Sequence, residues 1–296
     1  MDTLKRTFIA LIAFFFISVL TACSGGGDDD PAPVSNELAN LPEDTGGTHT
    51  PILQGTTSAQ FGYYEYLPGG YATNTNEYPL LVFLHGQSER GKGDTKTILD
   101  KVLANGPPKL IKAGAWDPTY PMIVISPQFY QIAGDDNVNN WGGGKPIYLK
   151  NFIEYLIATY RVNESRIYLT GLSHGGNGVF DYLTGSVDDT QSHLAAAAPI
   201  AAYGSGGGFS KSKNTPIWTF VGENDATNFS TTKNFITKYN AQSPAPKYPA
   251  KITAFAGAGH DVWTRTYSSS GMDTADAAFS PFSMTLYDWM FQYKRE

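Results

Sequence analysis

Short apolar runs alternate along the chain with segments that are expected to be helical. Runs without a polar interruption, such as Leu80–Leu84, are typical of parallel strands that are covered on both faces. The predicted strands are Phe61–Leu67, Leu80–Leu84, Met122–Ile125, Ile167–Leu169, Ala195–Ile200, Ile217–Val221 and Ile252–Phe255. The predicted helices are Thr97–Ala104, Ile147–Tyr160, one that begins at Ser173, Thr231–Tyr239 and Pro281–Tyr293. This alternation predicts a mostly parallel sheet with helices on both faces.

The connections between these elements are short, which leaves no room for a large lid domain. Two longer irregular segments, Gln128–Lys145 and Thr264–Phe279, are expected to line or cover a cleft. The second of these looks inserted before the final helix.

Composition and charge exclude several classes of protein. The chain has 296 residues, of which 41% are hydrophobic and 16% charged, which suits one α/β domain. Charges of one sign form no long run, so a disordered tail protein and a coiled coil are excluded. The net charge is −6 without a basic stripe, so no nucleic-acid partner is expected. The single cysteine excludes a disulfide framework and a CxxC…CxxC metal site.

The first residues have the features of an export signal. Lys5 and Arg6 precede a mostly apolar run, Phe8–Leu20, and small residues follow it. As a helix this run would span roughly 20 Å, which is too short for a hydrocarbon core of about 30 Å. We therefore expect a cleaved signal rather than a permanent transmembrane helix.

The segment Leu20-Thr21-Ala22-Cys23 resembles a bacterial lipobox. The resemblance implies that residues 1–22 are a lipoprotein signal peptide and that Cys23 is lipidated. Because Cys23 is followed by Ser24 and not by Asp, the resemblance also implies that the protein is anchored in the outer membrane. Residues 23–50, rich in Gly, Asp and Pro, are expected to form a flexible tether, and residues 51–296 the folded domain. An ordinary signal with an incidental cysteine is the alternative.

Candidate chemistry begins with Gly171-Leu172-Ser173-His174-Gly175, which lies between the strand Arg166–Thr170 and a predicted helix. In this context G-x-S-x-G is typical of a nucleophile elbow, which exposes the serine hydroxyl at the carboxyl edge of a sheet. The sharp turn needs small residues at Gly171 and Gly175, where a Cβ would clash. The helix N-terminus favours a developing alkoxide on Ser173. A glycine-rich turn with Ser173 as a helix cap is the alternative.

A serine nucleophile needs a base and a carboxylate that orients the base. In this architecture they follow in the order serine, acid, histidine. His260 is the expected base because it lies in a small-residue loop after the last strand, whereas His193 precedes a strand. Asp225 is the expected acid in the loop after Ile217–Val221, and Glu223 is its competitor.

Acyl transfer also needs two N–H donors for the oxyanion. The expected donors are the backbone amides of His174 and of Gln87, which lies in the loop after a predicted strand. Gly86 allows this loop to approach closely, and His85 is expected to brace the loop rather than to react.

With these residues the chain resembles the α/β-hydrolase superfamily over Pro51–Glu296. Within it, the chain is similar to secreted serine esterases of the polyhydroxybutyrate-depolymerase-like, feruloyl-esterase-like and prolyl-oligopeptidase-type group. The matching segments are Leu81–Gly86 with Glu89–Gly91, Ser126–Gln128, Gly171–Gly176, Gly222–Asp225 and Gly259–Trp263.

The resemblance implies an α/β-hydrolase fold with Ser173 as nucleophile, Asp225 as acid and His260 as base. It also implies that Glu89 and Arg90 brace the oxyanion loop. The chain departs from the family at Gln87-Ser88, where relatives commonly have a small residue and glycine, and this leaves the width of the acyl pocket open.

The expected function is that of an exported carboxylesterase for small, plant-derived or polymeric esters, with no metal or organic cofactor. Trp141 and Trp263 are candidates for the flat apolar surface that an aromatic acyl group or a sugar ring needs. A serine peptidase or amidase on the same scaffold is one alternative, although the domain has no space for a propeller. A non-catalytic glycan-binding lipoprotein is the other.

Overall fold

The computed structural model describes residues 36–130, 141, 146–185, 192–204, 212–268 and 284–295. The expected signal peptide 1–22 and the lipidation of Cys23 lie outside the described residues and stay predictions. None of the helices in the described ranges has both the length and the apolar composition needed to cross a membrane.

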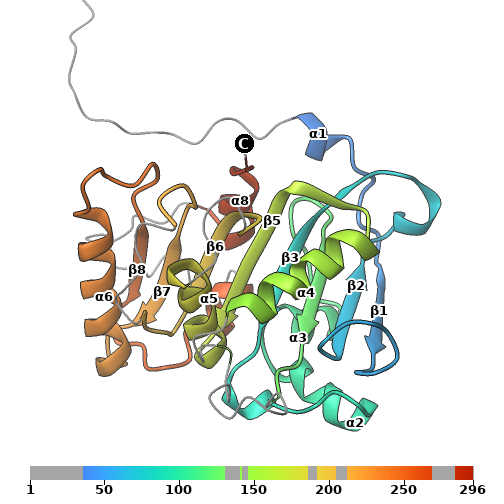
Figure 1. Ribbon diagram of the computed structural model, residues 1–296, viewed down its shortest axis with the longest axis horizontal. Coiled ribbons are helices and arrows are strands. Elements are labelled where there is room, and N and C mark those ends of the chain that lie inside the picture. Colours follow the sequence, from blue (N-terminus) through green and yellow to red (C-terminus); the bar gives the residue numbers. More distant parts are fainter. Residues whose placement is uncertain are drawn as a thin grey trace, which may run out of the picture. The chain divides into compact units, whose positions relative to one another are not determined.

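Within the described ranges, eight strands form one sheet in the order β1-β2-β4-β3-β5-β6-β7-β8 (Figure 1). β2 runs antiparallel to both of its neighbours, and the other neighbouring pairs are parallel. Parallel strands bring their carboxyl ends to one edge, where open α/β sheets bind their ligands. The strands are β1 (Thr48–Ile52), β2 (Tyr63–Leu67), β3 (Tyr78–Leu84), β4 (Ile123–Pro127), β5 (Val162–Leu172), β6 (Leu194–Ile200), β7 (Trp218–Gly222) and β8 (Lys251–Phe255).

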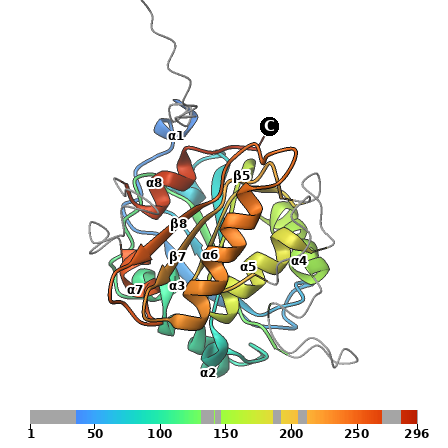
Figure 2. The same cartoon turned by 90° about the vertical axis from the view of Figure 1, so that its left-hand side faces the viewer.

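Helices cover both faces of the sheet, as predicted (Figures 1 and 2). One face packs against α4 (Pro146–Thr159), α5 (His174–Thr184) and α6 (Ala226–Asn240). The other packs against α3 (Gly106–Lys112), α7 (Trp263–Ser268) and α8 (Leu286–Phe291). The shorter elements are α1 (Asn36–Ala39), α2 (Lys96–Leu99) and the 3₁₀ turns η1 (Tyr71–Thr73), η2 (Gln87–Glu89) and η3 (Asp100–Ala104).

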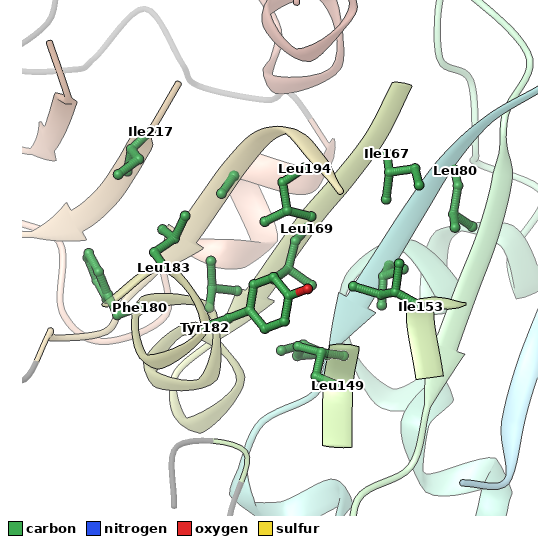
Figure 3. Packing of buried hydrophobic residues seen from close by; sticks show 14 of the residues in the cluster. Leu80, Leu149, Ile153, Ile167, Leu169, Phe180, Tyr182, Leu183, Leu194 and Ile217 are labelled. Carbon is green, nitrogen blue, oxygen red and sulfur yellow. The ribbon is translucent and has the colours of Figure 1, made fainter. Parts of the chain in front are cut away.

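The apolar runs are explained by this double cover. Successive strand residues point to opposite faces. Leu80 therefore packs under α4 and α5 with Ile167 and Leu169 (Figure 3), whereas Leu81 and Tyr168 pack on the other face. Because both faces are buried, neither set of positions is polar, and the run is uninterrupted.

All seven predicted strands and all five predicted helices are present, with shifted ends. β5 begins at Val162, five residues before the predicted strand, and α6 begins at Ala226, five residues before the predicted helix. The predicted helix 97–104 is α2 followed by the 3₁₀ turn η3, and α8 lies inside the predicted range 281–293.

The predicted tether 23–50 is wrong in its C-terminal part, because residues 36–50 include α1 and most of β1. β1 pairs with β2 in an antiparallel ladder from Thr48 opposite Leu67 to Ile52 opposite Tyr63. Leu38 is 1% exposed in the core that lies beneath α8. The folded domain therefore starts at or before residue 36, and not at residue 51.

The predicted irregular segment 264–279 begins inside a helix. Asp261 caps α7, since its carboxylate accepts the backbone N–H of Thr264 at 3.1 Å and the Thr264 hydroxyl at 3.0 Å. Thr266 and Tyr267 are buried against the sheet. Residues 269–283, which include the rest of this segment, lie outside the described residues.

Candidate active site

Ser173 lies at the sharp turn between β5 and α5. Its φ of 51° and ψ of −118° form a conformation that L residues rarely adopt. Its backbone N–H donates to the carbonyl of Ile200 at 2.9 Å, which ties the turn to the end of β6. A Cβ on Gly171 would lie 2.5 Å from the carbonyl carbon of Gly175, and a Cβ on Gly175 would lie 2.0 Å from the carbonyl oxygen of Leu84. The predicted need for small residues at both positions is confirmed.

Two further loops bring an imidazole and a carboxylate to Ser173. Nε2 of His260 lies 3.0 Å from Oγ of Ser173, and Nδ1 lies 2.6 Å from Oδ2 of Asp225. A carboxylate only accepts, so Nδ1 carries the hydrogen, and Nε2 is free to accept the serine proton. Asp225 begins α6 after β7, and His260 follows β8. The structure therefore brings together the three residues that the sequence grouped.

The competing acid and base lie elsewhere. The carboxylate of Glu223 accepts the backbone N–H of Gly257 at 3.2 Å, which closes a turn. His193 precedes β6, at the end of the sheet opposite Ser173, and its Nε2 lies 3.7 Å from the carboxylate of Glu154. Neither residue is bonded to Ser173 or His260.

Asn228 is a further polar residue at this site that the sequence analysis does not single out. Its Nδ2 donates to Oδ2 of Asp225 at 2.7 Å and lies 3.3 Å from Nδ1 of His260. Residues at the cap and at the third position of a helix face each other. Once Asp225 is known to begin a helix, the spacing of three residues between Asp225 and Asn228 is the sequence signal that indicates Asn228.

The two expected oxyanion donors flank Ser173. His174 is the first residue of α5, where a helix leaves its N–H without an internal partner. Gln87 opens the 3₁₀ turn η2 after β3. Neither N–H donates to another residue that the structure describes. Burial, with a smaller effect of Arg90, lowers the pKa of the His174 imidazole, so the ring beside His260 stays neutral.

His85 braces the oxyanion loop, as expected. It is 1% exposed, and its Nε2 accepts the backbone N–H of Phe129 at 2.9 Å. Nδ1 therefore carries the hydrogen and donates to the carbonyl of Gly86 at 2.6 Å. Burial lowers the pKa of His85 to about 4, which keeps this neutral tautomer at physiological pH.

Glu89 and Arg90 support the same loop, as the family resemblance implies. Glu89 is 3% exposed, and its carboxylate accepts from Nδ2 of Asn105 at 2.5 Å and from the Ser88 hydroxyl at 3.2 Å. Nε of Arg90 donates to the carbonyl of Gln87 at 3.2 Å. These contacts fix the backbone that presents the Gln87 amide.

A pocket of about 310 Å³ opens in front of Ser173. The Trp263 ring forms one wall and meets the His260 ring edge-on, with 5.1 Å between ring centroids. Within the part of the chain that the structure describes, no group of three or more His, Cys, Asp or Glu is placed to hold a metal ion. The pocket is lined by Gly86, Gln87, Ser88, Glu89, Asn105, Leu172, Ser173, His260 and Trp263.

Trp141 lies behind the oxyanion loop and not among the residues that line this pocket. Its ring packs at centroid distances of 5.6 Å from Phe61, 5.1 Å from Phe129 and 5.3 Å from His85. The expected substrate contact of Trp141 therefore has no support here, because its indole fills the aromatic core.

Comparison with known proteins assigns a fold to this arrangement. No protein-family model and no curated protein matches the chain. Among solved structures, a thermostable esterase is similar at 23% identity with a TM-score of 0.58, over 84% of this chain and 63% of that one. The feruloyl esterase module from Clostridium thermocellum, complexed with sinapinate, is similar at 14% identity with a TM-score of 0.56, over 89% and 93%. A structure of FAE is similar at 16% identity with a TM-score of 0.52, over 78% and 87%.

The chain has the α/β-hydrolase fold. The predicted fold class is therefore confirmed, and the described residues include no separate lid domain. The chain spans less than two thirds of the length of the thermostable esterase.

Proposed function

We propose that this protein is a serine carboxylesterase. The observation that carries the proposal is the relay from Asp225 through His260 to Ser173, with hydrogen bonds of 2.6 Å and 3.0 Å. The backbone N–H groups of His174, at the turn after β5, and of Gln87, at the turn after β3, would bind the oxyanion. The likeness in fold to esterases supports the same chemistry.

In the proposed reaction, Oγ of Ser173 attacks the ester carbonyl while Nε2 of His260 accepts its proton. Asp225 stabilises the imidazolium, and the N–H groups of Gln87 and His174 stabilise the oxyanion. In a comparable site, one such donor is worth about 2.7–4 kcal/mol. His260 then protonates the leaving alcohol, and a water molecule releases the acid by the same steps in reverse order.

The pocket favours an ester that carries a flat ring, either aromatic or of a sugar, next to the ester bond. The leaving oxygen must lie within hydrogen-bond reach of Nε2 of His260, and the Trp263 ring packs against that imidazole. A flat ring bound next to the ester would therefore meet the indole, which suits stacking. The feruloyl esterase module of similar fold was solved with sinapinate, an aromatic acid.

We also propose that the protein is exported and lipid-anchored at Cys23, in the outer membrane, after removal of residues 1–22. The lipobox resemblance alone supports this, and the tether would then run from Cys23 to the folded segment at Asn36. Labelling of cells with a fatty-acid probe should mark the wild type and not Cys23→Ser. Equal labelling of both would contradict the anchor.

An assay of matched esters and amides tests the proposed activity. Nitrophenyl acetate, methyl ferulate and an acetylated sugar are compared with peptide nitroanilides, using Ser173→Ala as the control. We expect ester hydrolysis that depends on Ser173 and is at least ~10²-fold faster than amide hydrolysis. Faster amide hydrolysis would support the peptidase. No turnover, together with glycan binding, would support the non-catalytic lipoprotein.

A further inference from the structure

The side-chain amide of Asn228 lies between three parts of the site. Its Nδ2 is 2.7 Å from Oδ2 of Asp225, 3.4 Å from the carbonyl oxygen of Ala201 and 3.3 Å from Nδ1 of His260. A carboxylate and a backbone carbonyl can only accept hydrogen bonds, so the NH₂ end of the amide faces the relay. Nδ1 of His260 also donates to Asp225, so the amide and the imidazole are co-donors to one carboxylate oxygen.

Two carbonyl groups at the end of β6 accept hydrogen bonds from residues at the two ends of the relay. The carbonyl of Ile200 accepts the backbone N–H of Ser173 at 2.9 Å, and the next carbonyl, that of Ala201, accepts from Asn228. Ala201 has a φ of 49°, which is uncommon for a residue other than glycine. Its N–H donates to Phe220 of β7 at 2.8 Å, which secures this turn. Backbone strain held in this way is found at functional sites.

We infer that Asn228 is a positioning residue of the relay. It holds the carboxylate of Asp225 in the rotation that presents Oδ2 to His260. This inference rests on the proposed function, and Asn228 itself touches neither the substrate nor the reacting atoms.

The physical effect has two parts. A second N–H donor stabilises the ionised carboxylate and restricts its rotation, so the imidazole keeps the tautomer with a free Nε2. The donor also disperses charge on Oδ2, which moderates how strongly Asp225 favours the protonated imidazole. Replacing the neutral amide with a second carboxylate would do the opposite, because added negative charge beside the imidazole favours its protonated form.

Four other titratable groups lie near His260 in the described residues. Glu89 lines the same pocket, but it is buried and its carboxylate accepts from Asn105. His174 begins α5, and burial, with smaller effects of nearby charges, lowers the pKa of its ring. Glu223 follows β7 and accepts from Gly257, while Asp261, the next residue in the chain, caps α7. None of these side chains hydrogen-bonds to Asp225. Asn228 is therefore the polar group best placed to change how strongly Asp225 holds the proton of His260.

The test compares Asn228→Asp, Asn228→Leu and the matched control Asn224→Asp. Asn224 lies in the turn that precedes α6, is exposed, and donates to the carbonyl of Gly257 rather than to the relay. Asn228→Asp keeps the shape of the side chain and should move the acid limb of kcat/KM for nitrophenyl acetate up by about one pH unit. Asn224→Asp should move it by less than about a third of that. Asn228→Leu should lower kcat roughly tenfold with KM nearly unchanged.

The inference fails if Asn228→Asp leaves the pH profile unchanged, or if Asn228→Leu keeps more than half of kcat. Thermal unfolding of each variant separates positioning from misfolding, and the near-isosteric Asn228→Asp decides the matter if Asn228→Leu unfolds. Ser173→Ala is assayed in parallel. If Ser173→Ala is fully active, the proposed function itself is wrong. If it is inactive while both Asn228 variants behave like the wild type, only this inference is wrong.

Discussion

Nε1 of Trp263 donates a hydrogen bond to Oδ1 of Asn105 at 3.3 Å, and the same Asn105 donates to the buried carboxylate of Glu89. Trp263 lies against His260, and Glu89 lies under the loop that carries the Gln87 amide. This pair of bonds therefore connects the wall beside the base to the wall that supplies an oxyanion donor. Substitutions in it should change substrate selection as well as rate.

Trp263→Ala should discriminate between substrates. Loss of the indole removes the flat surface that a ring next to the ester would meet, so kcat/KM for methyl ferulate should fall at least ~10-fold. For ethyl acetate, which carries no ring on either side of the ester, the fall should be clearly smaller. Trp116→Phe, remote from the Ser173 pocket, is the control and should change neither value. An equal loss for both esters would contradict the substrate role of Trp263.

Gly175→Ala should destabilise the fold. The added Cβ would lie 2.0 Å from the carbonyl oxygen of Leu84, and its three nearest neighbours are all backbone atoms of Leu84 and His85, which cannot turn away as a side chain can. Overpacking of this kind costs roughly 1–3 kcal/mol or more, measured as the free energy of unfolding in urea. Gly259→Ala has open space around its Cβ and should change stability by less than about 0.5 kcal/mol. Similar values for the two variants would contradict the close approach of α5 to β3.

His85 should make stability depend on pH. Burial lowers the pKa of His85 in the folded protein to about 4, below the value of about 6.5 in an unfolded chain. Between these values the unfolded chain binds the proton and the folded protein does not, so stability is lost as the pH falls from about 6.5 to about 4. The loss should total about 3 kcal/mol. Urea unfolding should show a shallower pH dependence for His85→Gln, and parallel curves would contradict this account.

Arg166 should stabilise the ends of the described domain. It is 2% exposed, and it donates to Glu37 at 2.6 Å and to the carbonyls of Phe291 and Tyr293 at 2.8 and 3.2 Å. Arg166→Met would leave those acceptors without this donor and should lower the free energy of unfolding by roughly 3 kcal/mol. Glu37→Gln removes only the more exposed partner and should cost less than about 1 kcal/mol. Equal effects would show that the ion pair, and not the buried guanidinium, is what matters.

The sequence predicts the central strands because burial on both faces leaves an unmistakable apolar run, as in Leu80–Leu84. It does not predict β1, since Thr48–Ile52 is a partly exposed edge strand with polar residues and a proline. The helix α7 is missed for a related reason: its six residues carry little periodicity, and the capping bonds of Asp261 are visible only in three dimensions.

The residues of the site also divide into those that the sequence predicts and those that it does not. Ser173, Asp225 and His260 can be predicted because each follows a strand of the expected sheet, and topology brings strand ends together. Asn105 cannot be predicted, because it contacts other side chains rather than follows a motif, and Asn228 can be found only once Asp225 is known to begin a helix. Trp141 shows the converse, because a tryptophan chosen as a flat apolar surface for the substrate packs against Phe129 and does not line the pocket at Ser173.

Covalent labelling of Ser173 tests the central claim most directly. A fluorophosphonate probe reacts with a serine only when a base and an oxyanion site activate it, and tryptic mass spectrometry locates the adduct. We predict stoichiometric modification of the peptide that contains Ser173, a rate reduced at least ~10³-fold in His260→Gln, and no adduct in Ser173→Ala. An unmodified wild type, or equal modification of Ser173→Ala at another residue, would contradict it.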